Sequence, residues 1–245
     1  MRKYAGVYWV IRLRPILDPD VRRIVEESNY FTGQVMQNDE DAGYYLMQQL
    51  HDAGKNKVAL VTTARLDSVG IARERGAYRA AEEFGMEIVA EIRSTTTEDD
   101  IYRAVSDVIL AHPGTEAVFR VGSHVRGSAQ AAIRAITDSP GAGDIRFVTI
   151  DISEITPEDF DSGVVLAAMG AVGPLDSSIA TAILVNAITG VPLDPDGPSV
   201  FAIDYLAFHS STELLKYNQF FDERQEVLFS EDEVRKSCSG SSTPI

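Results

Sequence analysis

The segment "KVALVTTARLDSVGIARERGAYRAAEEFGMEIVAEI", residues 57–92, decides the fold class. It begins with an apolar run, Lys57–Thr62, continues with an amphipathic pattern, Arg73–Phe84, that stops at Gly85, and ends in a second apolar run, Glu87–Ile92. A strand, a helix and a further strand in this order are typical of a βαβ unit, whose strands lie parallel in one sheet. The segment therefore indicates an α/β protein.

The same alternation of apolar runs and amphipathic stretches extends over most of the chain, and it predicts parallel sheets covered by helices. The further strands are expected at Gly6–Ile11, Ala117–Val121, Arg146–Ile150, Val164–Met169 and Ser199–Ile203, and the further helices at Asp39–Ala53, Glu98–Ala111, Gly127–Thr137 and Ser177–Thr189.

Composition excludes several classes of partner. The chain has 245 residues, and its 22 Lys and Arg against 37 Asp and Glu give a formal net charge of −15. Binding to phosphate backbones or anionic lipid surfaces requires a positive footprint, so we expect no nucleic-acid partner.

No apolar run approaches the roughly 18 residues of a transmembrane helix. The start, "MRKYAGVYWVIRLRP", is interpreted as a strand rather than a signal peptide, because its apolar stretch is short and no small-residue cleavage site follows.

The sequence carries no catalytic or metal-binding motif. It has no G-x-S-x-G elbow, Walker loop, H-E-x-x-H or C-x-x-C, and its four histidines show no metal-ligand spacing. The single cysteine, Cys238, cannot form an internal disulfide, which leaves the compartment open. We therefore expect no enzyme activity, no cofactor and no metal.

Two arginines, Arg73 and Arg75, lie in the first turn of the expected helix, where the helix dipole disfavours cations. Polar residues also follow the strands: Thr63 and Asp67 come after Lys57–Thr62, and Asp151 directly follows Arg146–Ile150. In open α/β sheets, ligands bind at the carboxyl ends of the strands. Two interpretations stay open for these groups: a ligand site, or an aspartate that caps a turn and arginines that are solvated or ion-paired.

The order of the segments "KVALVTT…ARERGAYRAAEEFGMEIVAE…DVILAHPGTEAVF…IRFVTID…GVVLAAM…ATAILVNAITGVPL" resembles the type I periplasmic binding proteins, which include sugar receptors of ABC transporters and effector domains of LacI-type regulators. In this family an arginine three residues before a helical glycine binds ligand oxygens. Arg73 lies three residues before Gly76 and so matches this position. A strand-end aspartate, matched by Asp151, accepts hydrogen bonds from sugar hydroxyls. The resemblance thus implies a ligand site formed by Arg73, Asp151, Thr63, Asp67 and Ser123.

The resemblance also implies a two-lobe fold whose N-terminal lobe is reduced. We expect the reduced lobe to comprise 1–56 and 173–198 and the C-terminal lobe 57–172 and 199–245, with crossings near Gly54 and Val172. Roughly the first three βα units of the family's first lobe have no counterpart, which implies a partial reading frame, a trimmed fragment or a family member with a reduced lobe. Such a lobe would expose apolar surface and an open strand edge, so we expect self-association that buries Val7, Trp9 and Ile11, and weak sugar affinity.

Three functions follow as hypotheses. The first is a solute-binding protein for a small, sugar-like molecule, with a membrane permease as partner and a periplasmic or extracellular location, all implied by the resemblance. The second is the effector-sensing domain of a LacI-type transcription regulator. The third, an enzyme on a Rossmann-like sheet, has no nucleophile–base pair or cofactor fingerprint in its favour.

Overall fold

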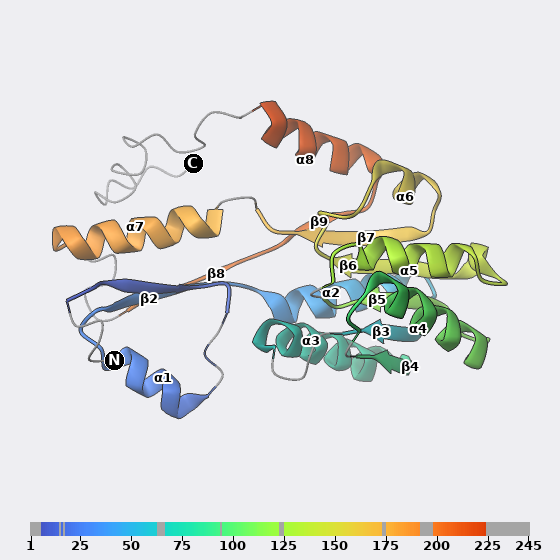
Figure 1. Cartoon of the computed structure of the whole chain (residues 1–245), viewed down its shortest axis with the longest axis horizontal. Coiled ribbons are helices and arrows are strands. Elements are labelled where there is room, and N and C mark those ends of the chain that lie inside the picture. Colours follow the sequence, from blue (N-terminus) through green and yellow to red (C-terminus); the bar gives the residue numbers. More distant parts are fainter. Residues whose placement is uncertain are drawn as a thin grey trace. The chain divides into compact units, whose positions relative to one another are not determined.

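The computed structural model describes residues 6–14, 16, 18–62, 67–93, 95–122, 125–172, 175–191 and 198–223. The chain forms two compact units, each built from discontinuous segments (Figure 1). The first unit comprises residues 1–37, 172–204 and 220–245, and the second comprises 38–171 and 205–219. Both are α/β structures with parallel strands, so the fold class expected from the sequence is confirmed.

The second unit contains a six-stranded sheet with the order β4-β3-β5-β6-β7-β9. Its strands are β3 (Lys57–Val61), β4 (Glu87–Ile92), β5 (Ala117–Arg120), β6 (Arg146–Ile150), β7 (Val165–Gly170) and β9 (Leu206–Phe208). The first five pair in parallel, whereas β9 pairs antiparallel with β7 and forms one edge. Because the parallel strands run the same way, their carboxyl ends share one edge of the sheet.

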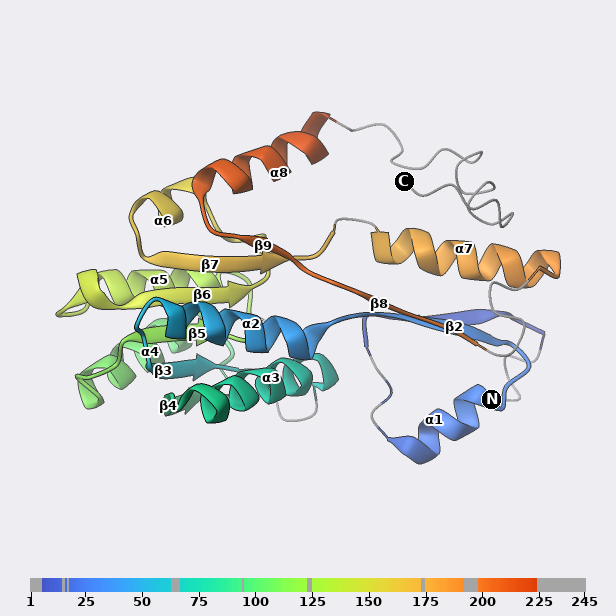
Figure 2. The same cartoon turned by 180° about the vertical axis from the view of Figure 1, so that it is seen from behind.

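Helices cover both faces of this sheet, as Figures 1 and 2 show from opposite sides. They are α2 (Asp39–Asp52), α3 (Ser68–Phe84), α4 (Glu98–Ala111), α5 (Ser128–Thr137), α6 (Pro157–Asp161) and α8 (Ser211–Glu223), and a short 3-10 helix spans Ala142–Asp144. Alternate residues of a strand face opposite sides. Accordingly, Val58 and Leu60 pack in a core with α2 and α3, whereas Ala59 and Val61 pack in a core with α4 and α5.

The first unit contains a parallel three-stranded sheet with the order β1-β2-β8. Its elements are β1 (Trp9–Arg12), α1 (Pro19–Glu26), β2 (Phe31–Gln37), α7 (Leu175–Thr189) and β8 (Ser199–Ile203). Helix α7 packs on the sheet through Ala180 and Ile183, which contact the fully buried Val35 of β2. Arg12 at the end of β1 forms an ion pair of 2.9 Å with the buried Asp176 in the first turn of α7.

Helices α2 and α3 cross at a pair of glycines. A Cβ atom at Gly43 would overlap the backbone carbonyl oxygen of Arg73, and a Cβ atom at Gly76 would overlap that of Glu40. The contact is therefore reciprocal, and each helix can approach the other only because the facing residue has no side chain. This close approach brings the N-terminus of α2 against the segment of α3 that carries Arg73.

Most elements expected from the sequence are present, but the start of one helix was predicted wrongly and a strand of the first unit was missed. Helix α3 begins at Ser68, so Arg73 and Arg75 lie well inside the helix and not in its first turn. The strand Phe31–Gln37 was not expected as a separate element, because it reads "FTGQVMQ" and lacks a continuous apolar run.

The unit boundaries also differ from those expected. Residues 38–56, which include α2, were assigned to the reduced lobe, but they belong to the second unit, and the chain passes between units at Gln37 and Asn38 rather than near Gly54. Residues 199–204, which form β8, belong to the first unit. The physical reason is packing: α2 contacts α3 through the glycines and contributes the fully buried Leu46 and Leu50 to the core of the second unit.

The glycine crossing makes a prediction about stability. Substitution of Gly76 by Ala should lower the free energy of unfolding by about 1–3 kcal/mol, because the added methyl group overlaps a backbone carbonyl, although Ala favours helices intrinsically. Gly143→Ala is the matched control, since a Cβ atom there meets no atom within 4 Å. Urea unfolding followed by circular dichroism measures both variants; a Gly76→Ala protein as stable as the Gly143→Ala protein would contradict the close crossing.

Candidate functional site

Polar side chains gather where the strands of the second unit end. Strands β3, β5, β6 and β7 finish at Val61, Arg120, Ile150 and Gly170, and these ends share one edge of the sheet. In parallel sheets this edge is where ligands bind. Three groups of side chains lie there: a cluster around Arg73, a buried network around Arg120, and Asp151 with the loop that follows it.

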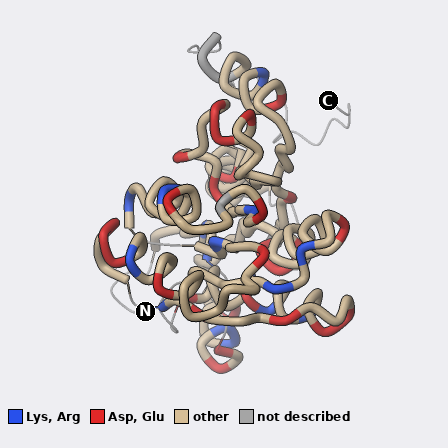
Figure 3. The backbone as a smooth tube through the Cα atoms, turned by 90° about the vertical axis from the view of Figure 1, so that its right-hand side faces the viewer, with Lys and Arg blue, Asp and Glu red and all other residues tan. Residues whose placement is uncertain are grey.

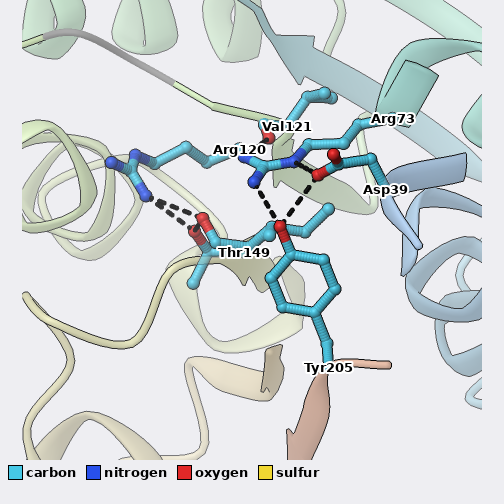
Figure 4. A network of polar contacts seen from close by, with 7 residues as sticks. Asp39, Arg73, Arg120, Val121, Thr149 and Tyr205 are labelled. Carbon is cyan, nitrogen blue, oxygen red and sulfur yellow. Dashed lines mark hydrogen bonds and ion pairs between the residues drawn. The ribbon is translucent and has the colours of Figure 1, made fainter. Parts of the chain in front are cut away.

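The cluster around Arg73 joins three elements of the second unit (Figure 4). The Nε atom of Arg73 donates to Oδ1 of Asp39 at 2.7 Å, and Nη2 donates to the Tyr205 hydroxyl at 2.7 Å. The Tyr205 hydroxyl in turn donates to the same Oδ1 of Asp39 at 2.8 Å, and Nη1 of Arg73 donates to the carbonyl oxygen of Val121 at 3.2 Å. The guanidinium is thus bonded on all three nitrogens by groups of its own chain.

Burial and neighbouring groups shift the pKa values of Tyr205 and Arg73 in this cluster. Burial raises the pKa of the Tyr205 phenol, although the Arg73 cation acts in the opposite direction, so the hydroxyl stays protonated at neutral pH and serves as a donor. Burial alone would lower the pKa of Arg73, but Tyr205 and the Asp39 carboxylate outweigh it and the pKa is raised. The cluster therefore combines a fixed cation, a carboxylate and a neutral hydroxyl.

Arg120 lies at the end of β5 and is only 3% exposed. Its Nε donates to the Ser128 hydroxyl at 2.7 Å, and its Nη1 donates to the Thr149 hydroxyl at 3.0 Å and to the carbonyl oxygen of Ile150 at 3.2 Å (Figure 4). Burial lowers the pKa of this guanidinium. Arg120 thus ties the end of β6 to the first residue of α5, beneath the edge of the sheet.

The N-terminus of α5 is occupied by a carboxylate of the chain itself. Glu154 accepts hydrogen bonds from the backbone N–H of Gly127 at 2.6 Å and of Ala129 at 2.8 Å. Free N–H groups at a helix N-terminus form an anion site. Because Glu154 takes this position, the start of α5 is not a place for a ligand phosphate.

Asp151 follows β6 with φ of 97°, a backbone conformation that residues other than glycine rarely adopt. Its backbone N–H donates to the carbonyl oxygen of Met169 at 2.7 Å, and its Oδ1 accepts from the N–H of Ser153 at 2.9 Å. The side chain is exposed. Backbone strain of this kind concentrates at functional sites, where surrounding contacts hold a side chain in a required direction.

Three of the five residues expected at the site lie in the described part of the chain. Arg73 is buried at the sheet edge, but it forms no hydrogen bond or ion pair with Asp151 in the part of the chain that the structure describes. Asp67 is buried at the N-terminus of α3. Thr63 and Ser123 lie outside the described residues. Arg75 points to the surface and pairs with Glu40 at 2.7 Å, so it is an ion-paired helix residue.

Sequence reasoning missed Asp39, Tyr205 and Arg120. Asp39 comes two residues after β2. Polar residues that follow a strand were taken as site candidates, which is how Asp151 was found, and Asp39 would have been included if β2 had been expected. Arg120 interrupts the apolar run "AVFRV", and a charge inside a buried strand is itself a signal. Tyr205 lies in "IDYLAF" between two short strands, where no pattern distinguishes it.

Other site classes are not indicated by the described residues. They contain no group of three or more His, Cys, Asp or Glu side chains arranged to hold a metal ion. None of their helices is both long enough and apolar enough to cross a membrane. Along the chain tube in Figure 3, Lys and Arg are dispersed among Asp and Glu.

Comparison with known proteins gives structural matches alone. No protein-family model matches the sequence, and no curated protein matches it. Among solved structures, an ABC-transporter periplasmic solute-binding protein from Actinobacillus succinogenes 130z, with bound D-allose, is 18% identical with a TM-score of 0.73, covering 88% of this chain and 72% of that one. A periplasmic sugar-binding protein from Pseudomonas fluorescens is also 18% identical with a TM-score of 0.73, covering 96% of this chain and 69% of that one.

A transcription regulator, CelR, in complex with cellobiose is 20% identical with a TM-score of 0.65, covering 83% of this chain and 58% of that one. With identities this low, the TM-scores show that these proteins share the fold of this chain, and no more than the fold. Together with the parallel sheets and the chain passing repeatedly between two units, they confirm the fold that the order of segments predicted. The chain therefore has the type I periplasmic-binding-protein fold.

Proposed function

We propose that the chain is a solute-binding domain that holds a small, neutral, sugar-like molecule at the carboxyl edge of the sheet in its second unit. In this proposal the ligand is bound by Arg73, Asp151, Asp67, Thr63 and Ser123. The chain binds its ligand without transforming it, because its sequence lacks a nucleophile–base motif and a cofactor fingerprint.

One observation carries the proposal: Arg73 is held beside Asp39 at the strand edge with a hydroxyl group between them. A sugar hydroxyl both donates and accepts hydrogen bonds, so it pairs well with a guanidinium donor and a carboxylate acceptor on two sides. The Tyr205 hydroxyl makes this pair of bonds in the structure. The cluster is thus chemically suited to a polyol.

Asp151 supports the same proposal. Its carboxylate is exposed at the end of β6, its backbone is held at φ of 97°, and its contact with the Ser153 N–H leaves acceptor capacity on the side chain. A carboxylate has about four acceptor positions. A sugar-like ligand is also supported by the solved structures that share the fold, since one is a solute-binding protein with bound D-allose and another is named a sugar-binding protein.

The second candidate function is the effector-sensing domain of a LacI-type transcription regulator. The match to CelR favours it, because that regulator is described with cellobiose bound. The net charge of −15 opposes contact with DNA by this chain itself. The genomic sequence upstream of Met1 separates the two functions: an export signal supports the solute-binding protein, and a helix-turn-helix segment supports the regulator.

For the solute-binding function we propose a periplasmic or extracellular location and a membrane permease as the partner that receives the ligand. We also propose self-association through the first unit. Strands β1 and β8 are the edges of its three-stranded sheet, and edges invite pairing with another chain. Val7, just before the half-buried Trp9 and Ile11 of β1, is 56% exposed, and Val200 of β8 is 63% exposed.

The ligand site predicts a specific loss of affinity. Asp151→Asn should weaken sugar binding about tenfold, because hydrogen bonds to a charged acceptor are worth more than those to an amide oxygen. The measurement is titration calorimetry against aldoses and cyclitols, including D-allose and myo-inositol. Asn tolerates positive φ better than most residues, so the fold should be retained.

Asp144→Asn is the matched control, because Asp144 is an exposed carboxylate just before the opposite end of β6. It should bind like the unmodified chain. Equal affinities of the two variants would remove Asp151 from the site. Failure of the unmodified chain to bind any sugar of the panel at millimolar concentration would argue against the proposed function.

Self-association makes a separate prediction. At tens of micromolar the chain should sediment as a dimer or larger species, and Val7→Lys should shift it toward the monomer by placing a charge on the apolar edge. Leu110→Lys is the control, since Leu110 is 71% exposed on α4 of the other unit. A monomer at these concentrations would show that the first unit does not pair with a second copy.

A further inference from the structure

We infer that Tyr205 competes with the ligand for Arg73 and Asp39, and so sets both the affinity of the site and the hydroxyl pattern it accepts. The inference rests on the proposed function, which it extends to a residue outside the family resemblance. It is carried by the geometry of one hydroxyl group and by the position of Tyr205 in the chain.

The phenol oxygen makes the two bonds that a sugar hydroxyl would make. It accepts from Nη2 of Arg73 at 2.7 Å and donates to Oδ1 of Asp39 at 2.8 Å. The other two nitrogens of Arg73 bond to Asp39 itself and to the carbonyl oxygen after β5. A ligand hydroxyl that bridges Nη2 of Arg73 and Oδ1 of Asp39 in the same way must therefore take the place of the phenol.

The Tyr205 side chain can move away from this position at a lower free-energy cost than Asp39 or Arg73. Asp39 begins α2 and Arg73 belongs to α3, and these two helices are locked together by Gly43 and Gly76. Tyr205 instead belongs to the two-residue connection between β8 and β9, and the pairing of β9 with β7 begins one residue later, at Leu206. Its backbone is free of the strand ladder, and its side chain is only partly buried.

The exchange defines a class of ligand. A hydroxyl that both accepts and donates replaces the phenol without loss, whereas an ether oxygen removes one of the two hydrogen bonds that Oδ1 of Asp39 accepts. An anionic ligand is opposed by the Asp39 carboxylate, which is 4% exposed. The site should therefore favour neutral polyols and reject their O-methylated and acidic analogues.

The test compares the unmodified chain with Tyr205→Phe and Tyr102→Phe. Tyr102 is the matched control, since its hydroxyl also donates to a carboxylate of the second unit, Asp138, at 3.0 Å. Calorimetry with D-allose, myo-inositol and their O-methyl derivatives gives the affinities. Tyr205→Phe should bind the best polyol about fivefold more tightly, because one net hydrogen bond no longer opposes binding. Tyr102→Phe should bind like the unmodified chain.

Melting in the absence of sugar separates competition from a structural role. Competition predicts that Tyr205→Phe melts about 2–4 °C lower and yet binds more tightly. Unchanged or weaker binding by Tyr205→Phe, while the unmodified chain binds sugar, would overturn the inference and leave the proposed function intact. Binding by Tyr205→Phe alone would support both, and no binding by any of the three proteins would refute both.

Discussion

The ion pair between Asp39 and Arg73 joins the first residue of α2 to the interior of α3, and the arrangement of the sheet edge depends on it. Both side chains are largely withdrawn from water, with exposed fractions of 4% and 15%. Loss of one partner from a buried pair leaves an uncompensated charge, which costs about 3–5 kcal/mol. The pair can form only because Gly43 and Gly76 allow the two helices to touch.

From this pair, hydrogen bonds extend to two of the four places where the chain enters or leaves the second unit. Asp39 is the second residue after the boundary at Gln37 and Asn38, and Tyr205 is the first residue after the boundary that follows Asp204. At another boundary, the carbonyl oxygen of Ala171 accepts from the Tyr217 hydroxyl at 3.0 Å. Side-chain hydrogen bonds within the second unit thus lie at three of the four boundaries. Arg73 makes two of these hydrogen bonds, to Asp39 and to Tyr205. It is therefore an internal anchor of the second unit as well as a candidate ligand-binding residue.

The sequence predicted the second unit well because its signals are local. Runs such as "RFVTI" and "KVALV" fill buried parallel strands, and a Thr97–Asp100 capping box marks the start of α4. The helix α2 was predicted, but it was assigned to the other unit, because a glycine-mediated contact between helices leaves no periodic pattern in the sequence. Arg73 was selected from the sequence as a candidate site residue, whereas its partners Asp39 and Tyr205 come from segments that only the fold brings together. In the function proposed here, the choice of ligand depends on these partners, so local sequence patterns do not reveal it.

A double-mutant cycle between Asp39→Asn and Arg73→Gln tests the central claim most directly, with the free energy of unfolding in urea as the readout. If the buried pair organises this edge, each single change destabilises strongly, and the double change costs less than the sum of the two by about 2–3 kcal/mol. Additivity within about 0.5 kcal/mol would show that the two residues do not interact, and would contradict the account of the site.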